Sequence, residues 1–202
     1  MSVAIVDYDM GNVSSVQKAL QAIGVENVLS KDPEVIARSQ YIILPGVGAF
    51  AQGMENIRNA GLERILTHEV MEKKKPFLAI CIGLQLLASE GTEPVSTQGL
   101  GWIEGKVIKI EELDKRIPHL GCNELQAEKD GFFAEFDQKD FYFIHSYHFE
   151  VKDQTCIAAR VHYGGDYVAA IQKDNIYATQ FHPEKSQANG LRLIEKFIRE
   201  NA

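Results

Sequence analysis

The sequence predicts an α/β protein with a mostly parallel open sheet, helices on both faces of the sheet and an added antiparallel β portion. Two observations lead to this fold class. In the first half of the chain, short β-branched runs alternate with segments of helical periodicity, which is typical of parallel strands joined by crossover helices. From residue 99 to residue 149, glycines, prolines and aromatic residues punctuate short runs, as they do in antiparallel sheets.

The first elements follow from hydrophobic patterning. Residues 3–7 are an apolar run that predicts a buried strand. Apolar side chains then recur at helical spacing over residues 13–23, and Gly24 ends that helix. Residues 25–29 form the second predicted strand.

The next helix has clear start signals. Asp32-Pro33-Glu34 supplies an N-cap, a proline in the first turn and an acidic residue, and predicts a short helix to about residue 39. Residues 41–44 form the third predicted strand, which the turn Pro45-Gly46-Val47-Gly48 ends. Helical patterns cover about residues 51–74 and break near Gly61.

The remaining elements complete one sheet. Residues 77–80 predict a strand that leads into Cys81, and residues 168–171 and 176–180 predict an antiparallel hairpin. Residues 187–199 form a final amphipathic helix. Because no repeat, low-complexity tract or linker separates the two halves, we expect a single domain over residues 1–202 and one continuous sheet.

Composition narrows the classes of partner. The 202 residues are 45% hydrophobic and 24% charged, which is ordinary for a globular protein. A net charge of −7 disfavours nucleic acid and anionic membrane surfaces, which bind basic proteins. The basic run Lys73-Lys74-Lys75 is interpreted as a solvated helix end.

The sequence favours a cytoplasmic protein. Residues 1–7 enter a strand without a basic leader, and no apolar window is long enough for a transmembrane helix. Three widely spaced cysteines, Cys81, Cys122 and Cys156, indicate neither a disulfide framework nor paired metal ligands. A reducing compartment fits this cysteine usage best.

The most informative segment is residues 76–87, where an apolar strand stops at Cys81 and a helical pattern begins. This is the pattern of a nucleophile elbow, in which the start of the following helix favours the thiolate. Near the other end of the chain, His182 is a candidate general base and Glu184 can orient it. The three side chains together predict cysteine-dependent nucleophilic catalysis.

Backbone groups for such chemistry are expected at the same sheet edge. Sites of open parallel sheets lie outside the carboxyl ends of the strands, so the loops with Asn12, residues 45–48 and Cys81 should converge. The two glycines of the 45–48 turn allow a backbone N–H to approach a reacting carbonyl closely. The N–H groups of Val47 and Ile82 are therefore the candidates for an oxyanion hole.

The motifs resemble those of class I glutamine amidotransferases, a flavodoxin-like fold, over essentially the whole chain. The narrower resemblance is to the family of glutaminase subunits of imidazole glycerol phosphate synthase. The resemblance rests on five segments and on the start Asp7-Tyr8-Asp9-Met10-Gly11-Asn12. The five segments are residues 45–50 (PGVGAF), 81–85 (CIGLQ), 117–123 (IPHLGCN), 143–147 (FIHSY) and 180–186 (QFHPEKS).

The resemblance implies hydrolysis of the side-chain amide of glutamine. Cys81 would attack the amide carbon, His182 would pass the thiol proton to the departing ammonia, and Glu184 would hold the imidazole tautomer. Five residues of this chain match positions that bind the substrate in the family. These are Gly48, Gln85, Glu93, Ser146 and Tyr147.

The resemblance also implies a protein partner and no cofactor. The family sends its ammonia into a (β/α)8-barrel cyclase, which forms imidazole glycerol phosphate and aminoimidazole carboxamide ribotide (AICAR) in histidine biosynthesis. Asn12, Tyr142 and Lys185 match interface positions near the mouth through which ammonia would pass. His145 and His148, three apart, are expected on opposite faces of a strand, which argues against a shared metal.

Two departures from the family pattern keep further assignments open. Ala79 stands where the elbow often has glycine, and Cys122 stands where the family usually has tryptophan, in a segment that faces the partner. A paralogous subunit that serves sugar amidation in surface-polysaccharide synthesis would share all the motifs. A stand-alone cysteine-dependent γ-glutamyl hydrolase and a catalytically silent binding module are also compatible with the sequence.

Overall fold

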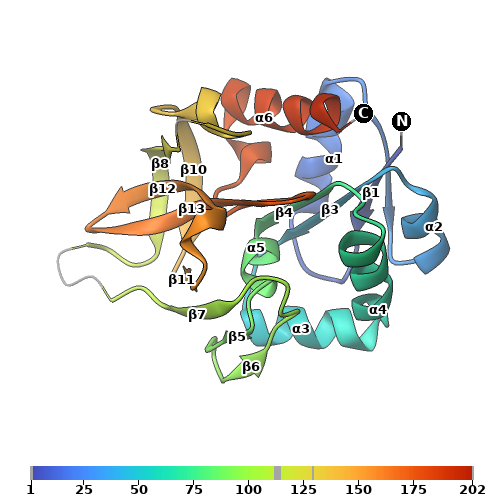
Figure 1. The fold of residues 1–202 in the computed structure, drawn as a ribbon, viewed down its shortest axis with the longest axis horizontal. Helices are drawn as coiled ribbons and strands as arrows, with labels where there is room; N and C mark the ends of the chain where they lie inside the picture. The colour runs from blue at the N-terminus through green and yellow to red at the C-terminus, as the bar shows by residue number, and fades with distance from the viewer. Residues whose placement is uncertain (1, 112–114, 129, 202) are drawn as a thin grey trace.

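A large sheet runs through the centre of the computed structural model, which describes residues 2–111, 115–128 and 130–201 (Figure 1). Within these residues the sheet has eight strands in the order β2-β1-β3-β4-β14-β13-β12-β9. In chain order they are β1 (Ser2–Val6), β2 (Glu26–Ser30), β3 (Tyr41–Gly46), β4 (Phe77–Cys81), β9 (Gln126–Ala127), β12 (Ile157–Tyr163), β13 (Gly165–Lys173) and β14 (Ile176–Thr179).

The predicted mixture of parallel and antiparallel pairing is confirmed. Strands β2, β1, β3, β4 and β14 are parallel, whereas β13, β12 and β9 extend the sheet in antiparallel fashion. The β3–β4 register pairs Gly46 with Cys81, so the two strands end side by side. This shared edge places the loop after β3 next to the cysteine.

Helices cover both faces of the sheet and enclose two apolar cores. Helices α1 (Val13–Ala22) and α6 (Gln187–Glu200) pack over one face (Figure 1). Helices α2 (Pro33–Arg38), α3 (Phe50–Asn59), α4 (Leu62–Thr67) and α5 (Ile82–Leu86) pack over the other. Along β1, Val3 and Ile5 enter the first core and Ala4 and Val6 the second, because successive side chains of a strand alternate between faces.

The expectation of one continuous sheet is wrong for the middle of the chain. Strands β8 (His119–Glu124) and β10 (Asp140–His145) form a separate pair. Strands β5 (Glu90–Gly91), β6 (Thr97–Gln98), β7 (Gly105–Lys109) and β11 (Tyr147–Val151) form a third sheet. The pairs β8–β10 and β7–β11 join segments that other elements separate in the sequence, and their pairing therefore leaves little trace in local sequence patterns.

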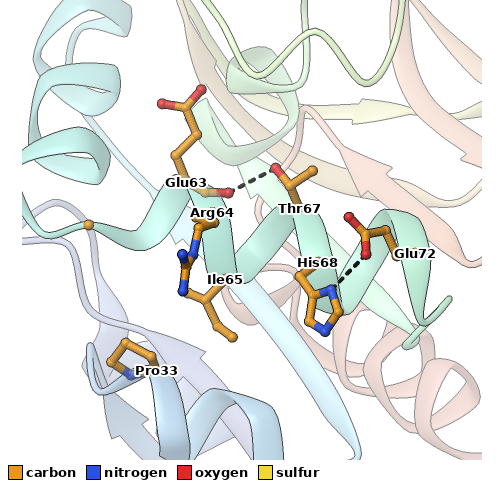
Figure 2. A pocket seen from close by; sticks show the side chains of 8 residues that line it. Pro33, Glu63, Arg64, Ile65, Thr67, His68 and Glu72 are labelled. Atoms are coloured by element: carbon orange, nitrogen blue, oxygen red, sulfur yellow. Dashed lines mark hydrogen bonds and ion pairs between the residues drawn. The ribbon is translucent and has the colours of Figure 1, made fainter.

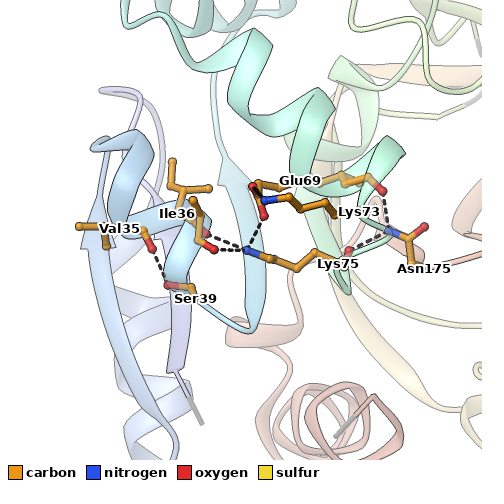
Figure 3. Close-up of polar contacts among 9 residues, drawn as sticks. Val35, Ile36, Ser39, Glu69, Lys73, Lys75 and Asn175 are labelled. Carbon is orange, nitrogen blue, oxygen red and sulfur yellow. Dashed lines mark hydrogen bonds and ion pairs between the residues drawn. The ribbon is translucent and has the colours of Figure 1, made fainter.

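The break at Gly61 is confirmed, but the interpretation of the lysine run is wrong for Lys75. Gly61 has φ 69° and separates α3 from α4, which continues into a π-helical turn over His68–Glu72. The Lys75 side chain is only 11% exposed and pairs with buried Glu69 at 2.7 Å (Figure 3). It also donates hydrogen bonds to the carbonyl oxygens of Ile36 and Ala37, so this lysine ties α2 to the π-helical turn.

No helix among the described residues is long and apolar enough to cross a membrane. The short single-turn helices η2 (Ala134–Phe136), η3 (Gln154–Cys156) and η4 (Pro183–Lys185) complete the fold. Of these, η4 matters most, because it follows β14 at the same sheet edge as Cys81 and precedes α6.

Candidate active site

Cys81 occupies a strained turn between strand β4 and helix α5. Its backbone has φ 56° and ψ −109°, which a non-glycine residue adopts only when its surroundings enforce it. The following helix packs closely on β3, since a Cβ atom on Gly83 would lie 2.1 Å from the carbonyl oxygen of Leu44. Ala79 leaves room for this helix. Its Cβ would lie 3.6 Å from a Cβ atom built on Gly83, which is an ordinary van der Waals distance. The geometry is that of the predicted elbow.

His182 and Glu184 lie together after strand β14. Nδ1 of His182 is 2.7 Å from Oε1 of Glu184, and both side chains are almost fully buried. Burial alone would lower the pKa of His182, but its interactions with Cys81 and with Glu184 outweigh burial and raise that pKa well above its usual value. The other ring nitrogen, Nε2, is buried and has no hydrogen-bond partner among the described residues. A cysteine on such a turn, with a histidine that a carboxylate holds through Nδ1, is an arrangement typical of nucleophilic cysteine chemistry.

The loop after β3 lies beside the cysteine and carries one of the two oxyanion-hole candidates, Val47. Gly48 has φ 117°, a backbone conformation that favours glycine. A Cβ atom on Gly11 would lie 3.2 Å from Cα of Gly46, which shows that the loop after β1 packs on this turn. Val47 is exposed, between the two glycines of the turn. The predicted convergence of three loops at the sheet edge is therefore confirmed.

A cavity of about 350 Å³ opens beside Cys81. It contains both oxyanion-hole candidates and all five residues expected to bind substrate. Its lining consists of Val47, Gly48, Cys81, Ile82, Gln85, Glu93, Ile144, His145, Ser146, Tyr147 and Lys185. Burial raises the pKa of Glu93, while a hydrogen bond from the backbone N–H of Phe50 opposes that shift. The volume and the polar groups suit a small zwitterionic molecule.

The three residues expected at a partner interface are not all neighbours. Nζ of Lys185 lies 5.9 Å from the ring centroid of Tyr142, so these two side chains form a cation–π contact. Lys185 also lines the cavity beside Cys81. Asn12 lies outside the cavity lining, in the loop that packs on the turn after β3.

Two residues near the cysteine have no catalytic or substrate-binding role in the expectations from the sequence. Gln180 is fully buried, with Nε2 3.8 Å from Sγ of Cys81. His145 is buried and lines the cavity, and its Nδ1 donates to the carbonyl oxygen of Tyr147 at 2.8 Å. The signal for Gln180 was its position two residues before His182, since such residues point to the same side of an extended chain.

The histidine pair considered for a metal does not share a strand. His145 is the last residue of β10, and His148 lies in β11. The expectation that the two histidines lie on opposite faces of one strand is therefore wrong. Residues 2–111, 115–128 and 130–201 contain no group of three or more His, Cys, Asp or Glu side chains that could hold a metal ion.

A larger groove lies elsewhere on the molecule, lined by residues of α4 and the π-helical turn and by Pro33 of α2 (Figure 2). Several of its polar side chains already have partners: Thr67 donates to the backbone carbonyl of Glu63, and His68 pairs with Glu72. It lacks a buried nucleophile or a buried unpaired polar group, so the cavity at Cys81 remains the candidate site.

Comparisons with known proteins agree with this geometry. A family model described as glutamine amidotransferase class-I matches residues 4–201. The chain is 46% identical over 200 residues to imidazole glycerol phosphate synthase subunit HisH 1 of Campylobacter jejuni strain RM1221, covering 98% of this chain and 99% of that protein. It is 43% identical over 202 residues to subunit HisH of Aquifex aeolicus, with 98% and 97% covered.

Solved structures share the fold at lower sequence identity. A crystal structure of a glutamine amidotransferase superposes with a TM-score of 0.77 at 22% identity, covering 98% of each chain. A chain from the structure of PurLQS of Thermotoga maritima superposes with a TM-score of 0.72 at 17% identity, covering 100% of this chain and 99% of that one.

Proposed function

This chain belongs to the class I glutamine amidotransferase family, and from that premise we propose that it is the glutaminase subunit of an imidazole glycerol phosphate synthase. It would hydrolyse glutamine to glutamate and ammonia and deliver the ammonia to a cyclase subunit. The observation that carries the proposal is the buried His182–Glu184 pair, which follows β14 at the same sheet edge as the cysteine of the elbow. The two relatives described above are named HisH subunits of that synthase, which supports the same assignment.

The first half of the reaction would form a thioester. The Cys81 thiolate attacks the side-chain amide carbon of glutamine, and the N–H groups of Val47 and Ile82 bind the oxygen on which negative charge develops. The imidazolium of His182 then donates its Nε2 proton to the amide nitrogen. The carbon–nitrogen bond breaks, ammonia leaves and a glutamyl thioester remains on the sulfur.

The second half would regenerate the enzyme. Neutral His182 takes a proton from water, and the resulting hydroxide attacks the thioester carbon. The carbon–sulfur bond breaks, glutamate leaves, and the sulfur returns to the thiolate beside the imidazolium. Glu184 holds Nδ1 of the ring throughout, so Nε2 is the nitrogen that exchanges protons with the reactants.

The cavity lining supports glutamine as the substrate. Glu93 offers a carboxylate for the α-ammonium group, and Ser146 and Tyr147 offer backbone groups for the α-carboxylate. The buried Oε1 of Gln85 has no partner among the described residues and is available to a donor on the substrate. These roles follow from the family match residue by residue.

The ammonia acceptor would be a barrel-shaped cyclase in the cytoplasm. Lys185 lines the cavity and contacts Tyr142, and Cys122 is exposed on β8, where its register partner is Tyr142. We therefore expect this face to meet the partner. A partner that aminates a sugar would instead assign the chain to the paralogous branch.

The function is tested by measuring glutamate release by the purified chain, alone and with the cyclase subunit and its nucleotide ligand. We expect slow hydrolysis alone and a large stimulation in the complex. Labelling with a glutamine-analogue electrophile should modify Cys81, and a Cys122→Ser variant should label equally. Full turnover without a partner would favour the stand-alone hydrolase. Folded protein that is not labelled at Cys81 would favour the silent binding module.

A further inference from the structure

The side chain of Gln180 is buried beside the nucleophile. It is 0% exposed, and its Nε2 lies 3.8 Å from Sγ of Cys81, within hydrogen-bonding distance for sulfur. The sulfur also lies 3.9 Å from the carbonyl oxygen of Ile144. The two contacts have opposite effects, because a carbonyl accepts from a thiol, whereas an amide N–H stabilises a thiolate.

The orientation of the Gln180 amide is fixed by Gln85. Nε2 of Gln85 is 3.0 Å from the backbone oxygen of Tyr147 and 3.0 Å from Oε1 of Gln180. Because a backbone carbonyl can only accept, the Gln85 atom between these two contacts must be nitrogen. The Gln180 atom that receives its second hydrogen must therefore be oxygen, and the nitrogen of Gln180 must face the sulfur.

The Tyr147 carbonyl that accepts from Gln85 also accepts a hydrogen bond from a buried histidine. Nδ1 of His145 is 2.8 Å from the same Tyr147 carbonyl oxygen and must be the donor. Its Nε2 is then the acceptor, 3.1 Å from Nδ1 of His119 on the paired strand β8. Burial, followed by the charges of nearby histidines, lowers the pKa of His145 to about 3, although the bond to Tyr147 opposes that shift. The carbonyl that fixes Gln85 is thus itself fixed.

We propose that Gln180 is a catalytic residue that donates a hydrogen bond from Nε2 to the Cys81 sulfur and stabilises its thiolate. The inference deepens the proposed glutaminase function and rests on it. The donor acts twice in the reaction: on the thiolate that attacks the amide carbon, and on the thiolate that leaves the thioester. No proton moves to or from Gln180, since an amide donates this bond without ionising.

The test measures how fast iodoacetamide alkylates Cys81 as a function of pH, in the chain alone and in a Cys122→Ser background. Peptide mass spectrometry assigns the modification to Cys81. We expect Gln180→Leu, which keeps the side-chain volume but has no donor, to move the midpoint of the alkylation curve upward by about one pH unit. Gln180→Glu should move it further, because a carboxylate repels the thiolate.

Turnover gives a second readout. In the complex with the cyclase subunit, Gln180→Leu should lower kcat about tenfold with little change in KM, because Gln180 contacts the sulfur and lies outside the cavity lining. The matched control is Thr179→Val, which removes a buried hydrogen bond to the Phe181 carbonyl at the residue next to Gln180. It should leave the alkylation midpoint unchanged.

An unchanged midpoint in folded Gln180→Leu protein would overturn the inference. If that variant does not fold, Gln180→Met, which has a more flexible side chain and no donor, should show the same upward shift of the alkylation midpoint. Failure of the proposed function looks different, since the wild-type chain with the cyclase would then not hydrolyse glutamine. The alkylation profiles need no glutamine turnover and would still report on Gln180.

Discussion

Nδ1 of His182 lies 2.7 Å from Oε1 of Glu184, in a place where water reaches neither side chain. The carboxylate can stabilise the imidazolium only while it carries charge. We expect Glu184→Gln, which keeps the shape, to lower kcat for glutamine hydrolysis by about 10²-fold or more. It should also lower the pKa of His182, because one cause of its upward shift is removed. The alkaline limb of the kcat–pH profile should then move to lower pH.

The measurement is the pH profile of glutamate release in the complex. Glu195→Gln, on the exposed face of α6, is the matched control and should keep the wild-type profile. A Glu184→Gln profile that superposes on the wild-type one would show that Glu184 only fills space.

Removing the nucleophile should separate the two activities of the complex. Cys81→Ala is expected to abolish synthesis from glutamine and to leave synthesis from added ammonia unchanged, because only the ammonia source is lost. Product formation is measured with each nitrogen donor. Cys122→Ser is the control and should retain both activities. Equal loss of both in Cys81→Ala would contradict this division of labour.

The last residue of β3, Gly46, has no room for a side chain. A Cβ atom there would lie 1.9 Å from Cγ2 of Ile82 and 2.0 Å from the hydroxyl of Tyr8. We expect Gly46→Ala to displace the start of α5, to cost about 1–3 kcal/mol of unfolding free energy and to reduce turnover strongly.

Chemical denaturation and glutamate release provide the two measurements for Gly46→Ala. The control is Gly53→Ala, whose added Cβ meets only the Leu86 side chain, at 3.1 Å, and gains helix propensity. It should be near neutral. Wild-type activity in Gly46→Ala would show that the close approach of β3 to α5 is not required.

The sequence was enough to predict the parts of the site that depend on residue type and order. It was not enough to predict which polar side chains are buried. The elbow at Cys81 and the pair His182 and Glu184 were readable because a strand, a turn and a helix start leave local signals. His145 was underestimated, because its burial results from the pairing of β10 with β8, two segments about twenty residues apart. Lys75 was misread for the same reason: its partner and acceptors come from other elements.

Lys75 should be important for stability. Its ammonium pairs with Glu69 at 2.7 Å and donates to two carbonyl oxygens of α2 (Figure 3). Burial raises the pKa of Glu69, but the bonds to Lys75 and Lys73 outweigh burial and hold it below its usual value. Lys75→Met leaves the Glu69 carboxylate with exposed Lys73 alone, and we expect a loss of about 3 kcal/mol in the free energy of unfolding.

Urea denaturation at neutral pH measures the effect of Lys75→Met. Lys74→Met is the matched control: Lys74 pairs with Asp174 at the surface, and the loss should stay within about 1 kcal/mol. Equal midpoints for the two variants would contradict the structural role given to Lys75.

His145 predicts how stability changes in acid. Its folded-state pKa of about 3 lies below the ordinary value of histidine, so the unfolded chain binds the proton more tightly. The contribution of neutral His145 is therefore fully present above about pH 6.5 and is lost as pH falls toward 3, with a slope of up to about 1.4 kcal/mol per pH unit. His145→Asn can still donate to the Tyr147 carbonyl but does not titrate. We expect its unfolding free energy, measured by urea denaturation, to fall less steeply between pH 6 and about pH 4.

A shallower but nonzero slope is the specific expectation for His145→Asn. Burial also lowers the pKa of His119, and that residue continues to destabilise the fold in acid. The control is Gln126→Asn, at an exposed position of β9 without a titratable group, which should keep the wild-type slope. If His145→Asn lowers stability equally at every pH, then the buried ring matters only for packing. A change of slope would show that the wall of the cavity at Cys81 depends on keeping this imidazole neutral.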